Sequence, residues 1–153
     1  MVKTPVDELV AFEAATRDLV GVALRSVENL EVSLPQFRLL MVLADIGKST
    51  STDCAKALGV VGSSVTRLAD RLDASGHLVR GSHPSNRSIV TLELTPRGRK
   101  LVKQVATKRR RDLSRVLDRL DPTERAACAS ALRDLHELFS DSSTEDLYNP
   151  VPL

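Results

Sequence analysis

The arrangement of apolar and polar positions changes twice between residues 60 and 95. Val61, Val65, Leu68 and Leu72 recur at spacings of four, three and four residues, which predicts a helix with one apolar face. Gly76 then stands where a helix-ending glycine is expected. We therefore predict a helix over residues 61–75 that is packed on one side only. Its opposite side carries Ser63, Thr66, Arg67, Asp70 and Ala74.

Two short alternating runs follow this helix. The first begins at His77, and the second returns from Ile89 to Leu94 with its apolar residues on one face. Pro, Ser and Asn residues between His83 and Ser88 predict a turn that joins the two runs. A helix followed by a β-hairpin is typical of a winged helix, which places the helix in the major groove of DNA and the hairpin tip at the flanking backbone or minor groove.

Two shorter helices are expected before this unit. Ser33 and Gln36 form a capping-box pattern ahead of an apolar run that Gly47 closes. Thr50 is the expected N-cap of a second helix that ends near Gly59, and together with the helix that follows it predicts a helix-turn-helix. No Ser, Thr or Asp caps the helix that follows, since Val61 or Gly62 occupies that position. The uncapped N–H groups could meet a DNA phosphate or water.

Long amphipathic helices are predicted at both ends of the chain. Residues 5–30 carry apolar residues at spacings of three and four, close to a heptad pattern. Thr95-Pro96 begins a helix to about residue 120, and Asp121-Pro122 begins the last one. The polar residues 141–153 are expected to form a tail. A two-fold dimer built from residues 6–30 and 121–140 would bury both apolar faces.

These elements predict a mainly α fold with a small β-hairpin wing, in one domain over residues 1–153. A winged helix-turn-helix lobe occupies residues 33–100, a connecting helix residues 95–120, and dimerisation helices the two ends. Residues 33–100 hold ten basic and five acidic side chains, whereas the whole chain has a net charge of only +2. The positive charge thus lies in the segment that would meet phosphates. The low aromatic content of 3% argues against single-strand and RNA binding.

The candidate DNA contacts come from three places in this lobe. Short hydroxyl side chains let a helix approach the groove closely, and an Arg side chain can bind the O6 and N7 atoms of guanine. The N-terminus of the helix after Thr50 is a further candidate phosphate site. The recognition-helix candidates are Ser63, Ser64, Thr66, Arg67 and Arg71, and the wing candidates are Arg80, His83, Ser85, Asn86, Arg87 and Ser88.

Catalytic, metal and cofactor sites are not predicted. The chain has no C-x-x-C, H-E-x-x-H, G-x-S-x-G or Gly-rich phosphate motif. We expect His77 and His83 to lie near phosphate or solvent, and Cys54 to be a small buried apolar residue. The basic run 108–111 is interpreted as a solvated face rather than a second DNA contact. Without a long apolar run, we expect a cytoplasmic, nucleoid-associated protein with no membrane contact.

Several motifs together resemble the MarR family of bacterial transcription regulators. They are S-V-T-R-L-A-D-R-L at 64–72, G-H-L-V-R at 76–80 and L-E-L-T-P-R-G at 92–98, and the resemblance covers about residues 6–140. It implies a homodimer that binds double-stranded DNA and represses or activates transcription. The wing departs from the family's usual Asp-x-Arg or Asp-Arg-Arg, because Asn86-Arg87-Ser88 stands there and Arg87 is one position early.

The resemblance also implies release by a small aromatic or acidic effector. Arg17, Arg25 and Arg38 are candidate cations for such a ligand. Since the first helix has no Cys, the oxidant-sensing subtype is not expected. Two alternative functions stay open: a winged-helix module that binds proteins, and a chromosome-coating protein without operator specificity.

Overall fold

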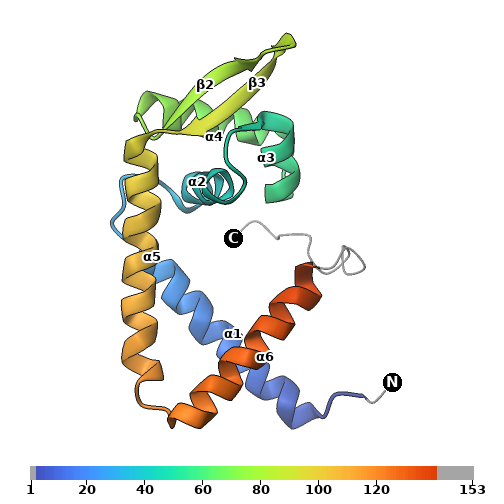
Figure 1. Cartoon of the computed structure of the whole chain (residues 1–153), viewed down its shortest axis with the longest axis vertical. Helices are drawn as coiled ribbons and strands as arrows, with labels where there is room; N and C mark the ends of the chain where they lie inside the picture. Colours follow the sequence, from blue (N-terminus) through green and yellow to red (C-terminus); the bar gives the residue numbers. More distant parts are fainter. Residues whose placement is uncertain (1–2, 141–153) are drawn as a thin grey trace.

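The computed structural model describes residues 3–140 and contains a winged lobe with long helices extending from it (Figure 1). The predicted tail at 141–153 lies outside the described residues. The predicted fold class is confirmed: in this described part of the chain six helices accompany one small antiparallel sheet. In chain order the elements are α1 (Val6–Val27), α2 (Leu34–Ile46), β1 (Ser49–Thr50), α3 (Ser51–Leu58), α4 (Gly62–Ala74), β2 (Leu78–His83), β3 (Asn86–Leu94), α5 (Pro96–Leu117) and α6 (Pro122–Ser140).

Local side-chain caps fix most helix starts where the sequence predicts them. Ser33 and Gln36 form both hydrogen bonds of a capping box at α2. The hydroxyl of Thr95 accepts the hydrogen bond of the Gly98 N–H at 3.1 Å and begins α5. The helices end slightly earlier than expected, since α1 stops at Val27 and α5 at Leu117.

The core of the lobe lies among α2, α3, α4, the sheet and the first half of α5. Phe37, Leu40, Val65, Leu72 and Leu92 are almost completely buried there. One position of the predicted apolar face is wrong: Val61 is 68% exposed. It is the extended N-cap residue of α4, so the helical period does not yet apply to it, and Ala69 packs in the core instead.

The hairpin is longer and its turn tighter than predicted. β2 and β3 pair as far as His83 and Asn86, which leaves only Pro84 and Ser85 between the strands. His83 and residues 86–88 are therefore strand residues rather than turn residues. The sheet has a third strand that was not predicted, because β1 is too short to show a period of two.

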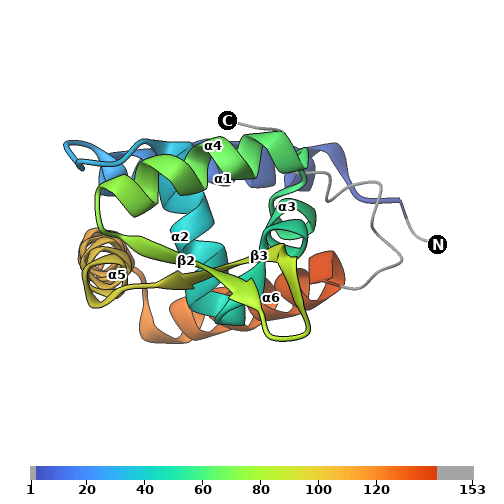
Figure 2. The same ribbon diagram turned by 90° about the horizontal axis from the view of Figure 1, so that it is seen from above.

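Helices α1 and α6 leave apolar side chains exposed at the end of the molecule opposite the lobe. The two helices cross in the projection of Figure 1 but lie on different sides in the view of Figure 2. Phe12 is 54% exposed on α1, and Leu132 is 47% exposed on α6. The apolar faces predicted for the two end helices are thus present, and they are exposed in the single chain. No helix within residues 3–140 is long and apolar enough to cross a membrane.

The basic run 108–111 is only partly the solvated face that we predicted. The ammonium group of Lys108 donates a hydrogen bond to the backbone carbonyl of Arg25, at the end of α1. Arg109 donates to the hydroxyl of buried Ser26 at 2.8 Å and lies 5.9 Å from the Phe37 ring centre. Four consecutive helical residues point in four directions, so two of them reach the α1–α5 contact.

A candidate nucleic-acid interface

Helix α4 presents a polar face that is largely exposed in the described chain. Val65, Ala69 and Leu72 hold the helix in the core. Ser63, Thr66, Arg67 and Arg71 are exposed as predicted, and Ser64 is half-buried. The arrangement is a fixed helix with short hydroxyl groups and two guanidinium groups directed outward, which suits the edges of base pairs in a major groove.

The first turn of α4 is open to a close neighbour. Its N-cap residue, Val61, supplies no side-chain hydrogen bond. A Cβ atom added at Gly62 would meet no heavy atom within 4 Å. The backbone at this end can therefore approach a phosphate group without a steric obstacle.

The polar residues of the hairpin tip shape the wing themselves. The Asn86 side-chain oxygen accepts hydrogen bonds from the Ser88 backbone N–H at 3.0 Å and from the Ser88 hydroxyl at 2.6 Å. The His83 ring accepts one from the Ser85 N–H at 3.2 Å. Arg87 is exposed and has no ion-pair partner within residues 3–140, so it is the side chain of the tip that remains available for a phosphate.

Two predicted contact residues already have partners in the protein. Arg80, in β2, forms an ion pair with Asp70 and thus links the wing to helix α4. The Thr50 hydroxyl accepts a hydrogen bond from the Asp53 N–H at 3.1 Å and donates one to the Asp53 carboxylate at 2.8 Å. Both side chains hold the lobe in shape, and a DNA contact would have to share these groups.

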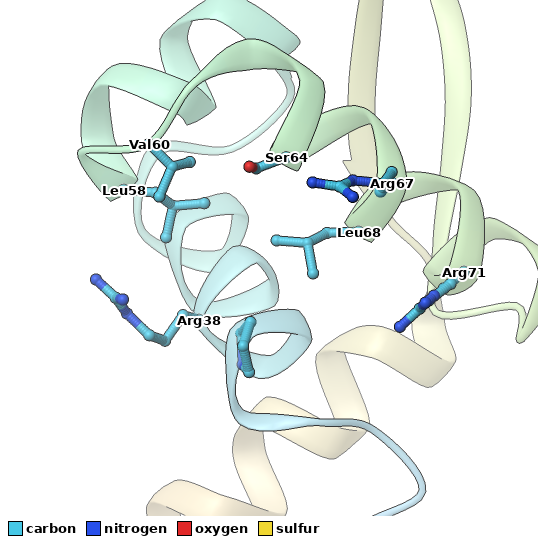
Figure 3. Close-up of a pocket in the computed structure, with 8 residues that line it drawn as sticks. Arg38, Leu58, Val60, Ser64, Arg67, Leu68 and Arg71 are labelled. Carbon is cyan, nitrogen blue, oxygen red and sulfur yellow. The ribbon is translucent and has the colours of Figure 1, made fainter. Parts of the chain in front are cut away.

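A cavity of about 330 Å³ lies between α2 and α4, beside the exposed face (Figure 3). Leu58, Val60 and Leu68 supply apolar walls. Arg38 and Arg67 lie on either side of it in Figure 3, and Arg71 lies one helical turn further along α4. Of the three predicted ligand cations, Arg38 lines this cavity, whereas Arg17 and Arg25 are exposed on α1.

His77 lies in a different environment from the one that we predicted. Its side chain is completely buried, and its two ring nitrogens contact the Ser75 hydroxyl at 2.7 Å and the Glu31 carboxylate at 2.9 Å. The expectation that it faces phosphate or solvent is wrong, because the turn after α4 directs it inward between the α1–α2 connection and α5. Sequence patterns gave no signal for this cluster, since Glu31 and His77 are 46 residues apart.

Within residues 3–140 no group of three or more His, Cys, Asp or Glu side chains is placed to hold a metal ion. Cys54 is completely buried in α3, as expected. Burial raises the pKa of its thiol to about 11, with a smaller contribution from the charge of Asp53.

Comparison with known proteins gives a consistent result. A model described as "MarR family" matches residues 30–87. YfiV of Bacillus subtilis, described as an uncharacterized HTH-type transcriptional regulator, is 31% identical over 117 residues, which are 76% of this chain and 73% of YfiV.

Two solved structures extend the similarity to most of the chain. RV1404 from Mycobacterium tuberculosis has a TM-score of 0.80 and 32% identity, and the match covers 90% of this chain and 96% of that one. BpsR of Bordetella bronchiseptica, whose DNA binding is regulated by 6-hydroxynicotinic acid, has a TM-score of 0.62 and 25% identity, with 85% and 98% covered.

Proposed function

Because the chain belongs to the MarR family of DNA-binding transcriptional regulators, we propose that it acts as a homodimeric repressor on a palindromic operator. A small aromatic or acidic effector releases it from the DNA. This role requires no catalytic residue and no cofactor, and it places the protein with the chromosome in the cytoplasm.

The observation that carries the proposal is the exposed polar face of α4. A helix that is packed on its opposite side loses little further conformational freedom when it enters a groove, so its side chains can discriminate bases. In our assignment Arg67 and Arg71 bind base edges or phosphates, assisted by Ser63, Ser64 and Thr66. Arg87 binds the flanking backbone, and Arg80 mainly positions the wing through Asp70.

The homodimer is inferred from the exposed apolar side chains of α1 and α6. Exposed apolar side chains along both helices favour burial against a second copy. In our domain assignment these helices form the dimerisation part, residues 33–100 form the DNA-binding lobe, and α5 connects the two. Two-fold symmetry then requires two half-sites about one DNA turn, roughly 34 Å, apart.

We place the effector in the cavity between α2 and α4. Its apolar walls and the three nearby guanidinium groups suit an aromatic ring that carries a carboxylate. A carboxylate there would hold Arg67 away from the bases and weaken operator binding. The effect of 6-hydroxynicotinic acid on BpsR agrees with an aromatic acid as the class of ligand.

The effector site can be tested with a panel of benzoate and nicotinate derivatives. We expect an active acid to raise the Kd of the wild-type protein for its operator. Arg38→Ala removes one cation of the cavity that is not on α4, so its operator affinity stays close to wild type while the response to the acid weakens. An unchanged response in Arg38→Ala would place the effector elsewhere.

The DNA-binding role is tested by fluorescence anisotropy across a salt series. A duplex from upstream of the protein's own gene is compared with a scrambled duplex of the same composition. We expect binding that weakens steeply with salt and prefers the upstream duplex. Equal binding to both would support the chromosome-coating alternative, and no binding at low salt would support the protein-interaction module.

A further inference from the structure

Glu31 joins three segments of the chain through one carboxylate. It lies in the connection between α1 and α2. One of its oxygens accepts a hydrogen bond from Nε2 of His77 at 2.9 Å, and the other accepts one from Arg97 at 2.7 Å. His77 follows α4 after Ser75 and Gly76, and Arg97 lies in the first turn of α5.

His77 itself is held on every side. Its backbone N–H donates to the Leu72 carbonyl at 2.8 Å, and its carbonyl accepts from the Thr95 N–H at 3.2 Å. Gly98 packs so closely that an added Cβ atom would lie 2.0 Å from the His77 carbonyl oxygen. The backbone of His77 is thus closely packed, and its hydrogen bond to Glu31 links the α1–α2 connection to the segment just after α4.

The charges in the cluster are complementary. The hydrogen bond from Arg97 lowers the pKa of Glu31, and the hydrogen bond from His77 acts in the same direction. The carboxylate is thus ionised at neutral pH and accepts both hydrogen bonds. Because His77 is buried, the cluster does not provide a direct DNA contact through its ring.

We propose that Glu31 is a positioning residue that fixes the angle of the recognition helix against the helices of the dimer interface, and so sets the half-site spacing that the protein accepts. The inference rests on the proposed homodimer. Helix α1 leads into the connection that holds Glu31, and α5 leads from Arg97 to α6, whereas His77 lies just beyond the end of α4 at Ala74. A rotation of α4 about this point changes the distance between the two recognition helices, and one base pair of spacing corresponds to about 3.4 Å.

The test measures binding to three duplexes that differ only in half-site spacing: the natural spacing, one base pair fewer and one base pair more. Wild type, Glu31→Ala and Glu31→Gln are compared, with Glu28→Ala as a control on the same connection. We expect wild type and Glu28→Ala to prefer the natural spacing. Glu31→Ala is expected to lower that preference by about fivefold or more, as couplings between packed elements typically do. Glu31→Gln keeps an oxygen for His77 and restores most of it.

A double-mutant cycle with His77→Gln identifies the route of the effect. If Glu31 acts through His77, Glu31→Ala changes the spacing preference little in the His77→Gln background. Glu31→Ala that weakens all three duplexes equally would overturn the inference and leave Glu31 a purely stabilising role. A wild-type protein that does not distinguish its operator from scrambled DNA would instead reject the proposed function, and this inference with it.

Discussion

At the scale of single residues, Arg67 combines an exposed side chain with a firmly packed helix backbone. Its neighbours in sequence include Val65 and Ala69, both fully packed, so the guanidinium group starts from a fixed backbone. We expect Arg67→Ala to cost roughly 1–3 kcal/mol of binding free energy on the operator and much less on scrambled DNA. Anisotropy titrations on both duplexes measure the difference. Arg115→Ala, a charge-matched control in the second half of α5, is expected to leave operator preference unchanged.

Arg67→Lys refines this prediction. A lysine keeps the charge but lacks the planar pair of donors that binds guanine O6 and N7 together. We expect it to retain affinity for scrambled DNA and to lose preference for the operator. An equal loss on both duplexes would mean that Arg67 binds phosphate and does not read a base.

Cys54 gives a prediction about pH. Burial raises the pKa of its thiol to about 11, and only the thiolate reacts readily with alkylating agents. The thiol therefore stays protonated and shielded through neutral and mildly alkaline pH. Iodoacetamide at pH 8, followed by mass spectrometry of peptides, is expected to modify Cys54 in denatured protein but not in folded protein. Modification of folded protein at a similar rate would contradict its burial.

At the scale of elements, the contact between the α4–β2 turn and α5 depends on Gly98. A Cβ atom there would lie 2.0 Å from a backbone oxygen, which cannot rotate away as a flexible side chain can. We expect Gly98→Ala to destabilise the fold by about 1–3 kcal/mol or more. Gly62→Ala is the matched control, because nothing lies within 4 Å of the added atom in the first turn of α4. Thermal denaturation followed by circular dichroism compares the two.

The elements also show which features can be predicted from sequence. Helix starts at Ser33 and Thr95, and the end of α4 near Gly76, follow from interactions within a few residues, so local patterns predict them. Strand β1 owes its existence to pairing with β3, some forty residues later in the chain, and two residues carry no readable period. Tertiary pairing, rather than propensity, creates it.

The same distinction applies to the candidate site. The exposed face of α4 could be predicted because the spacing of its apolar residues indicates that one side of the helix is packed. The partners of Arg80 and His77 could not be predicted, because Asp70 and Glu31 come from other elements. From the sequence alone, any other exposed acidic residue was an equally good candidate partner. On the polar face of α4 the sequence thus predicted which residues face outward, and the structure shows that Asp70 on this face is already paired with Arg80.

At the scale of the whole molecule, the exposed apolar side chains of α1 and α6 are the basis of the proposed homodimer. Leu19 is 47% exposed on α1 in the single chain, and a charge buried at that position in a dimer would lack a partner. We expect wild type to sediment with twice the 16.7 kDa mass of one chain, and Leu19→Glu to shift the equilibrium toward the monomer. Analytical ultracentrifugation over a concentration series measures both.

A control separates this effect from a general loss of solubility or folding. Ile46 is 51% exposed at the end of α2 and belongs to neither terminal helix, so Ile46→Glu is expected to remain dimeric. Monomeric Leu19→Glu is expected to bind an isolated half-site as weakly as wild type does. On the full operator it is expected to lose the added affinity that the second recognition helix of a dimer provides. A Leu19→Glu variant that remains dimeric would place the interface on other surfaces, and Glu31 would then not connect α4 to the helices of the dimer interface.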